Sequence, residues 1–421
     1  MRTNFSQAQL SDPALAAAER ELRVCVHCGI CTATCPTYTL LGDELDGPRG
    51  RIQLIQGMLE SGAAPCAKVV THIDRCLSCL ACVSACPSGV NYPRLIDEAR
   101  AHIEHSYRRP WADALLRRGL GFVLPRRALL RWALRVGRFA AQFVSLLPQS
   151  FRAAVEVAGK LPRPERARQY AKSYKAQGAQ RKRVALHMGC VQEVVAPAIS
   201  AAAVRVLTRF GADVTVVEGN GCCGALNHHL GQTEAFERRA RALTNDIAGQ
   251  DFDVVVTTAS GCGAVMRDYD FLLHDVARLG ARVRDIGDVL AELPIVSVRA
   301  LPKLRVGYHA ACSLAHGLRQ GIDIPALLTK LGFEVVTPSD TQCCGSAGVY
   351  NVLQPAIAGE LQTRKALALT ALRADVIVSG NVGCLMQIAS AVNTPVVHVV
   401  ELIDWATGGP VPGVLKARFS A

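Results

Sequence analysis

The pattern of apolar positions predicts two kinds of element along this chain. Four short runs are almost continuously apolar and rich in β-branched residues, at 214–218, 253–258, 334–337 and 375–380. Strands that are buried on both faces of a parallel sheet have this composition. Between these runs, apolar residues recur at helical spacing. We therefore expect α/β structure with parallel sheets in the second half of the chain.

That half contains an internal repeat, formed by residues 181–299 and 300–421. Each copy begins with a strand pattern that carries a His three residues before a Cys. A helix, a strand ending in Cys-Cys-Gly, a second helix and a β-rich run ending in a fourth Cys follow. The first cysteines of the two copies are 122 positions apart, so each copy has the size of a domain rather than of a solenoid repeat. The cysteines fall where strands end, which is where open α/β sheets bind ligands.

Residues 114–146 combine Arg with large apolar residues at helical spacing. A basic amphipathic segment of this kind can lie on an anionic membrane surface. The alternative is a helical linker that packs its apolar stripe on a partner or on the repeats and leaves its arginines in solvent. Because no nucleic-acid-binding fold is recognisable, we predict no nucleic-acid partner.

Composition and charge indicate a globular protein with one basic region. Half of the 421 residues are hydrophobic, which suits roughly two to four domains. The net charge is +12, and residues 101–183 hold 19 Lys and Arg against four acidic residues. The longest uncharged run, 376–400, is interrupted by Gly, Asn and Pro, so we expect no membrane-spanning helix.

The 17 cysteines indicate metal or redox chemistry. The N-terminus lacks a cationic segment followed by an apolar one, so we expect no secretory signal. In a reducing compartment, many thiols favour metal binding over disulfides. We predict no catalytic residue on this chain, because it has neither a Gly-rich dinucleotide turn nor a general acid–base constellation in its N-terminal region.

Residues 25–36 (CVHCGICTATCP) and 76–87 (CLSCLACVSACP) both match C-x2-C-x2-C-x3-C-P, the pattern of two-cluster ferredoxins. In this pattern, three cysteines of one motif bind one [4Fe–4S] cluster and the fourth binds the other cluster. The predicted ligands of cluster 1 are Cys25, Cys28, Cys31 and Cys86. Those of cluster 2 are Cys76, Cys79, Cys82 and Cys35. Cys66 fits neither motif, and we interpret it as an incidental thiol.

Each repeat supplies one Cys, an adjacent Cys pair and one more Cys. The intervening segments have 31 and 38 residues in the first copy and 30 and 39 in the second. Adjacent cysteines form strained disulfides, but both can face one metal centre from a tight turn. The candidate metal ligands are Cys190, Cys222, Cys223, Cys262, Cys312, Cys343, Cys344 and Cys384. His187 and His309, on the first strand of each copy, are weaker candidates, because a lone His is usually a core residue.

The repeats resemble the cysteine-rich domain of the heterodisulfide reductase family, called the CCG domain, over about residues 183–405. In family members with the full motif, the last element is C-x-x-C and the domain can hold an unusual iron–sulfur cluster. Here Val265 and Gln387 stand at the positions of the final cysteine. Two interpretations follow: an additional iron–sulfur cluster or redox metal in at least one repeat, or degenerate repeats that form a docking or quinone-facing surface.

The tandem ferredoxin motif, the run GDELDGPRGRI and the two CCG repeats together resemble the iron–sulfur subunits of glycolate oxidase (glycolate dehydrogenase) over the whole chain. The resemblance implies an electron-transfer subunit of an oxidoreductase complex. Flavin-binding subunits would oxidise glycolate to glyoxylate, and this chain would pass electrons toward a membrane quinone. It implies a cytoplasmic protein associated peripherally with the inner face of the cell membrane. Related subunits for glycerol-3-phosphate or lactate, and a disulfide or quinone reductase at a CCG site, are the alternatives.

The expected fold is multidomain and combines α+β and α/β parts. It consists of an α-helical ferredoxin-like domain with two clusters (1–100), a basic helical linker (101–182) and two α/β CCG domains (183–299 and 300–421). Within the first domain, Pro48 suits the start of a helix. Arg49 and Arg51 are then expected near the clusters, where they would raise the cluster potentials.

Overall fold

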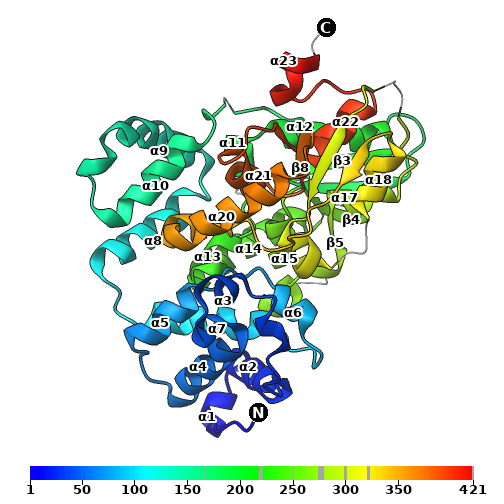
Figure 1. Ribbon diagram of the computed structural model, residues 1–421. Helices are drawn as coiled ribbons and strands as arrows, with labels where there is room; N and C mark the ends of the chain where they lie inside the picture. The colour runs from blue at the N-terminus through cyan, green and yellow to red at the C-terminus, as the bar shows by residue number, and fades with distance from the viewer. Residues whose placement is uncertain are drawn as a thin grey trace.

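The computed structural model describes the chain except residues 166, 218–220, 250, 274–278, 298–300, 320–322 and 420–421. Figure 1 shows the N-terminal helices below, the two sheets above them and a helical pair projecting to one side. Among the described residues, no helix combines the length and apolar character needed to cross a bilayer.

The N-terminal part of the described chain is entirely helical. Its elements are α1 (Gln7–Leu10), α2 (Pro13–Val24), η1 (Ile30–Thr32), α3 (Pro36–Leu41), η2 (Glu44–Asp46), α4 (Pro48–Ser61), α5 (Ala67–Asp74), α6 (Ala81–Ala85) and α7 (Tyr92–Ser106). Pro48 begins α4 as predicted, and Gly62 ends it in a left-handed conformation. The helices enclose an apolar core that includes Ile55, Leu95 and Ile103, each fully buried. This core holds the two cysteine motifs in place.

The basic segment forms several helices rather than one. These are α8 (Trp111–Val123), α9 (Arg127–Ala140), η3 (Ala141–Leu146) and α10 (Gln149–Lys160). The break between α8 and α9 coincides with Pro125, which cannot continue a helix. In Figure 1, α9 and α10 form the pair that projects from the side of the molecule. The predicted helical character of this segment is confirmed, with the chain folded back on itself.

The first repeat contains a sheet of five strands in the order β1-β3-β2-β4-β5. Its elements are β1 (Ser173–Tyr174), β2 (Lys182–His187), α11 (Gln192–Val195), α12 (Ala198–Arg209), β3 (Ala212–Val217), α13 (Ala225–His229), α14 (Thr233–Ile247), β4 (Val254–Thr257), α15 (Ser260–Met266), α16 (Tyr269–Leu272), η4 (Gly280–Arg282), β5 (Val283–Asp285) and α17 (Ile286–Ala291). Strands β2 to β5 pair in parallel, and only β1 is antiparallel.

The second repeat contains a parallel sheet in the order β7-β6-β8-β9. Its elements are β6 (Arg305–His309), the π-helical η5 (Ser313–Leu318), α18 (Ile324–Lys330), β7 (Glu334–Val336), α19 (Tyr350–Leu353), α20 (Pro355–Thr370), β8 (Val376–Ser379), α21 (Val382–Ala389), β9 (Val396–His398), α22 (Val399–Ala406), η6 (Gly413–Leu415) and α23 (Lys416–Phe419). Every strand predicted from the apolar runs is present, and the predicted parallel arrangement is confirmed.

One apolar core runs through both repeats, with Val184 and Val214 from the first sheet and Val306 and Val376 from the second. The predicted domain boundaries remain predictions. Helix α7 runs across residue 100, and β1 from the basic segment joins the first sheet. The predicted boundary between residues 299 and 300 lies within the undescribed residues 298–300.

Candidate metal centres

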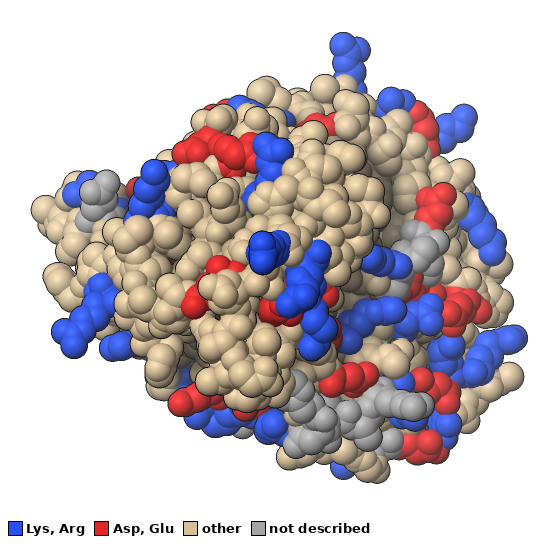
Figure 2. Space-filling model, turned by 90° about the horizontal axis from the view of Figure 1, so that it is seen from below, with Lys and Arg blue, Asp and Glu red and all other residues tan. Residues whose placement is uncertain are grey.

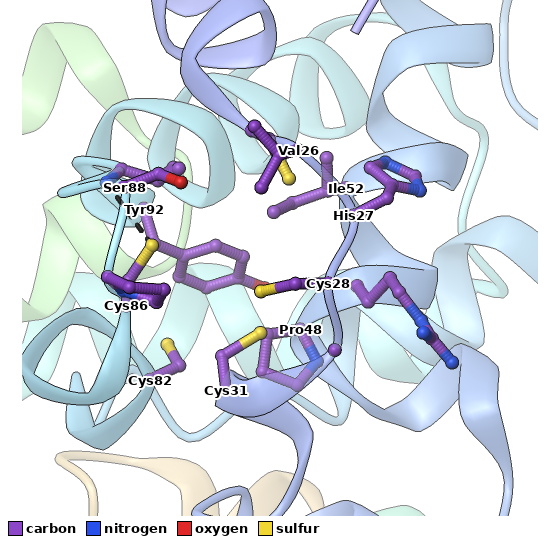
Figure 3. A pocket seen from close by; sticks show the side chains of 15 residues that line it. Val26, His27, Cys28, Cys31, Pro48, Ile52, Cys82, Cys86, Ser88 and Tyr92 are labelled. Atoms are coloured by element: carbon purple, nitrogen blue, oxygen red, sulfur yellow. Dashed lines mark hydrogen bonds between the residues drawn. The ribbon is translucent and has the colours of Figure 1, made fainter.

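The first cysteine motif surrounds a cavity near the surface. Its lining includes all four predicted cluster 1 ligands, Cys25, Cys28, Cys31 and Cys86. Figure 3 shows the sulfur atoms of Cys28, Cys31, Cys82 and Cys86 directed into this cavity from opposite sides. Gly29, between Cys28 and Cys31, adopts a positive φ of 81°, and this lets the loop turn around the cavity.

The second cavity is lined by Cys35, Cys76, Cys79 and Cys82, which are the four predicted cluster 2 ligands. Each motif therefore contributes its last cysteine to the lining of the other motif's cavity, and the crossed assignment of these cysteines as cluster ligands stays a prediction. Cys82 lines both cavities, so its sulfur lies at the wall between them. The two sites are thus immediate neighbours.

The two cavities differ in exposure. Beside the first, Cys28 is exposed, and the neighbouring apolar side chains of Val26 and Ile30 are 67% and 55% exposed. Beside the second, Cys35 and Cys76 are buried and Cys79 is half-buried. The first cavity therefore reaches the protein surface at Cys28, although its Cys25 is buried, whereas none of the four cysteines that line the second cavity is exposed.

The donor atoms fit iron–sulfur clusters. Burial, followed by repulsion from the thiolates of Cys86, Cys25 and Cys28, raises the pKa of Cys31 to about 11. Burial likewise raises the pKa values of Cys79 and Cys82 well above the usual thiol range. Several thiolates can share so small a volume only when cations neutralise them. Thiolate is also the soft donor that iron–sulfur clusters require.

A buried charge network supports the second cavity. The side chain of Arg51, which is 1% exposed, donates from Nη1 to Cys35 Sγ (3.8 Å) and from Nε to the carbonyl oxygen of His72 (2.7 Å). Asp46, fully buried, accepts from Arg51 at 3.5 Å and from Arg75 at 2.8 Å. The expectation that Arg51 lies near a cluster site is confirmed.

Two further neighbours of the thiols carry no recognisable sequence signal. Thr37 Oγ1 lies 3.2 Å from Cys35 Sγ, and the Tyr92 hydroxyl donates to Cys76 Sγ at 3.8 Å. Both residues line the second cavity. Only the folded backbone brings Tyr92 to the cysteine motif, so the spacing of residues in the sequence could not indicate it.

The cysteines of both repeats lie at the carboxyl ends of strands, as predicted. In the first repeat, interaction with Cys222 and burial raise the pKa of Cys190, and interaction with Cys222 and Cys262 raises that of Cys223, so the four cysteines are close neighbours. In the second, Cys312 Sγ and Cys343 Sγ are 3.8 Å apart. Cys343 and Cys344, the adjacent pair of the second repeat, also interact with each other and with Cys384.

The other candidate residues of the repeats have distinct environments. His187 donates from Nε2 to the carbonyl oxygen of Gly221 at 2.8 Å, in the tautomer that this bond requires. His309 Nε2 is buried and has no hydrogen-bond partner within the described part of the chain. At the positions of the missing final cysteines, Val265 is part of an apolar core, and Gln387 Oε1 accepts from Asn351 at 3.0 Å.

The second cavity adjoins the second repeat. Leu77 and Cys343 belong to one buried apolar cluster, and Cys79 and Cys312 pack against it. After the effect of burial, the nearby thiolate of Cys312 contributes most to the raised pKa of Cys79. A series of thiols therefore runs from exposed Cys28 through both cavities to the cysteines of the second repeat.

The N-terminal helices are also anchored to the first repeat. His228 and His229, which follow the first Cys-Cys-Gly turn, lie 3.1 and 3.7 Å from the carboxylate of Asp97 on α7. Arg94, one turn earlier on α7, forms a two-fold hydrogen bond with Asp268. The two histidines thus take part in packing between the ferredoxin-like part and the repeat.

Comparison with known proteins agrees with this arrangement. The family model described as a 4Fe-4S dicluster domain matches residues 21–90, the segment that forms both cavities. The cysteine-rich CCG domain matches twice, at residues 184–267 and 306–389. Iron–sulfur clusters are therefore cofactors of this chain.

Several relatives match this chain over more than nine tenths of its length. The glycolate oxidase iron–sulfur subunit of Escherichia coli (strain K12) is 37% identical over 424 residues, which cover 96% of this chain and 99% of the relative. The probable glycolate oxidase iron–sulfur subunit of Bacillus subtilis (strain 168) is 28% identical, covering 93% and 95%. A fumarate reductase (CoM/CoB) subunit of Methanothermobacter marburgensis is 25% identical, covering 92% and 73%. This chain belongs to the family of glycolate oxidase iron–sulfur subunits.

Proposed function

We propose that this chain is the electron-transfer subunit of a glycolate dehydrogenase complex. It accepts electrons from a flavin-binding partner that oxidises glycolate to glyoxylate, and it passes them toward a membrane quinone. The observation that carries the proposal is the series of thiols that begins at an exposed cysteine and ends against the second repeat. When bound, [4Fe–4S] clusters supply reversible one-electron transfer.

The proposed ligand sets follow the cavity linings. Cys25, Cys28, Cys31 and Cys86 hold one cluster. Cys76, Cys79, Cys82 and Cys35 hold the other. Cys82 lines both cavities, and its place in the second set rests on the motif, in which the first three cysteines of a run bind the same cluster.

The chain's own residues favour the first cavity as the place where electrons enter. Val26 and Ile30 form an exposed apolar rim next to Cys28. Exposed apolar side chains of this kind are suited to docking a protein partner. The buried Arg51 beside Cys35 stabilises added negative charge at the second cavity, so electrons are drawn inward.

Glycolate is the proposed substrate of the complex because two relatives with nearly full coverage are named as glycolate oxidase iron–sulfur subunits. The oxidation itself is assigned to a partner, because this sequence shows no dinucleotide-binding fingerprint. The role of this chain is then to bind the partner, hold the clusters and exclude water from the second site.

The proposal includes peripheral membrane association through the projecting helical pair. Six apolar side chains at steps of three or four residues lie on the outer face of α9 and η3, and all are exposed: Leu129, Trp132, Val136, Phe139, Phe143 and Leu146. We call this set the outer stripe. Figure 2 shows the projecting lobe, at the left edge of the view, as largely uncharged surface with Lys and Arg at its margins. Aromatic side chains beside basic ones suit the interface of an anionic membrane.

Three of the four arginines of α9, all but the exposed Arg135, donate to backbone carbonyls and so do not form the solvated face of the linker alternative. Arg127 donates to the carbonyl oxygen of Met188 at 2.8 Å, and Arg138 donates to that of Leu161 at 2.5 Å. Leu130 and Leu134, on the inner face, pack into the core of the repeats. The inner apolar residues therefore attach α9 to the repeats, and the outer stripe remains available to the membrane.

The experiment is affinity purification of the tagged full-length chain from its native cells under anaerobic conditions. The purified complex is assayed for dye reduction with glycolate, lactate and glycerol-3-phosphate in parallel. We expect a copurifying flavoprotein and reduction that is fastest with glycolate. A complex without flavin contradicts the electron-transfer role, and a preference for lactate or glycerol-3-phosphate contradicts only the substrate.

A further inference from the structure

The carboxyl end of the second sheet brings together three buried ligand groups. His309 is the last residue of β6, Cys344 lies in the turn after β7, and Cys384 is on α21 after β8. A ring nitrogen of His309 and the sulfur atoms of Cys344 and Cys384 all lie within 4.8 Å of one another. Ligands of a tetrahedral metal ion, each bound at about 2.0 to 2.3 Å, are separated by somewhat less than this, so small side-chain movements would close the site.

The histidine lacks the partner that a buried ring nitrogen normally has. Among the described residues, the buried Nε2 of His309 has no hydrogen-bond partner, and the side chain is 3% exposed. Ser379, which pairs with His309 in the sheet register, also has a buried and unpartnered Oγ. Buried polar atoms nearly always have a hydrogen-bond partner. Two neighbouring buried atoms without one therefore favour a bound ligand at this site.

The equivalent position in the first repeat is different. There Nε2 of His187 donates to a backbone carbonyl, and Thr257, the register partner of His187, donates to the carbonyl oxygen of Ala259 at 3.1 Å. Nδ1 of His187 is unpartnered, but within the described parts of the chain no set of three close ligand atoms forms around it. The two histidines have the same place in the sequence repeat and different surroundings.

The surroundings of the second site suit a thiolate-bound cation. Lys365, 1% exposed, forms an ion pair with Asp340 at 3.2 Å, and its ammonium group acts on Cys384 through space. A buried positive charge offsets part of the negative charge of metal-bound thiolates. Cys312 and Cys343, 3.8 Å apart, provide further sulfur donors at the same end of the sheet.

We propose that the second repeat, and not the first, binds a first-row transition-metal ion through His309, Cys344 and Cys384. Cys343, adjacent to Cys344 in the same turn, is the fourth donor. A mixed nitrogen and sulfur set suits iron or zinc. His309 thereby supplies a donor where the sequence motif lacks its final cysteine, because Gln387 is held by Asn351. The site adjoins the second cluster cavity through Cys312 and Cys79.

The test compares His309→Gln with the matched variant His187→Gln in the full-length chain. His187 is equally buried and ends the equivalent strand, so it controls for loss of a core histidine. Iron, zinc and acid-labile sulfide are measured after anaerobic purification. We expect the wild type to hold one metal ion beyond the roughly eight irons of two cubanes. His309→Gln loses that ion and keeps the eight, whereas His187→Gln keeps both.

A wild type without metal beyond the two cubanes overturns the proposal, as does equal loss of the extra ion in both variants. Circular dichroism and the sulfide count show whether each variant is folded with its cubanes intact. If the His309→Gln variant does not fold, the ligands of the ion are identified in the zinc-loaded wild type by X-ray absorption at the zinc edge. A shell of one nitrogen with sulfur ligands supports the site, and a shell without nitrogen or without sulfur overturns it. Loss of the cubanes with retention of this ion would contradict the electron-transfer proposal instead.

Discussion

The guanidinium group of Arg51 lies against the thiol of Cys35, with Nη1 3.8 Å from Sγ. Arg51 is held there by the carbonyl oxygen of His72 and by the buried carboxylate of Asp46. Arg75 shares that carboxylate, so the group carries more positive than negative charge. A fixed positive charge beside one ligand of a cluster stabilises the reduced, more negative state of that cluster.

Replacing Arg51 by Met is therefore expected to lower the midpoint potential of the second cluster. A unit charge at this range, with the effective dielectric constant of a protein, corresponds to a change on the order of 100 mV. The measurement is a redox titration followed by electron paramagnetic resonance. Arg51→Lys, which keeps the charge, should retain most of the potential.

Arg49→Met provides the control. Arg49 lines the first cavity, its side chain is 39% exposed, and it pairs with Glu44 at 2.7 Å, so solvent and the partner screen its charge. We expect a much smaller change, confined to the first cluster. Equal changes of the cluster midpoint potential in Arg51→Met and Arg49→Met would show that the effect of Arg51 is not electrostatic.

The crossed ligand sets predict opposite outcomes for the last cysteine of each motif. Cys35→Ser should remove the second cluster and Cys86→Ser the first, each lowering the iron content from roughly eight to roughly four per chain. The cluster that remains is identified by its potential, which Arg51→Met shifts only when the second cluster is present. Cys66→Ser is the control, because Cys66 is exposed and lines neither cavity. Loss of iron in Cys66→Ser would contradict the assignment.

Much of this arrangement could be predicted from the sequence because it depends on local spacing. The motif around Cys25 fixes which sulfur atoms one loop can present, and the Pro after Cys35 turns that residue toward the other site. The apolar strands likewise fix the sheets and place the cysteines at their carboxyl ends. These features depend on residues that are close together in the sequence, or on a pattern that occurs in both repeats.

The remainder depends on contacts between distant segments. His187 and His309 occupy equivalent positions in the sequence, and only the folded loops distinguish a histidine bonded to a carbonyl from one without a partner. The helical pattern of α9 predicted an apolar stripe but not its direction. The structure turns Arg127 and Arg138 toward backbone carbonyls and leaves Trp132 in solvent, because Leu130 and Leu134 occupy the inner face.

Charge placed in the outer stripe should weaken membrane binding. Trp132 and Phe139 are 63% and 66% exposed, so Trp132→Glu and Phe139→Glu should fold normally. Loss of aromatic burial in the lipid interface, with added repulsion from anionic lipid, is expected to reduce vesicle binding at least tenfold for the double variant. Cosedimentation with vesicles of anionic and neutral lipid measures this.

Leu367→Glu is the matched control for the stripe. Leu367 is 68% exposed on α20 and lies outside the projecting pair. Its substitution adds negative charge to the protein surface away from the stripe and should leave vesicle binding unchanged. If this variant and the stripe variants bind equally less, net charge rather than the stripe governs the association.

A buried histidine between the repeats predicts sensitivity to acid. His398 donates from Nε2 to the carbonyl oxygen of Thr258 at 2.9 Å, and its Nδ1 accepts from the backbone N–H of Val400 at 3.1 Å. Burial lowers the pKa of His398 to about 4, whereas an unfolded histidine has a pKa of about 6.5. Between these values the unfolded chain binds more protons than the folded one, so stability falls as the pH falls through this window.

His398→Asn separates this contribution from those of other groups. Asparagine can still cap α22, but it is too short to keep the bond to Thr258 and does not titrate. Above pH 7 the variant should melt at a lower temperature than the wild type, because the bond between the repeats is lost. Toward pH 5.5 the wild type alone loses about 1.4 kcal/mol of unfolding free energy per pH unit from this site, so the difference in melting temperature between the two proteins should narrow.

Asp285, whose pKa burial raises to about 7, changes stability in the opposite direction, but it is present in both proteins and cancels in the comparison. A difference in melting temperature that stays constant from pH 7.5 to 5.5 would mean that His398 is protonated equally in the folded and unfolded chains.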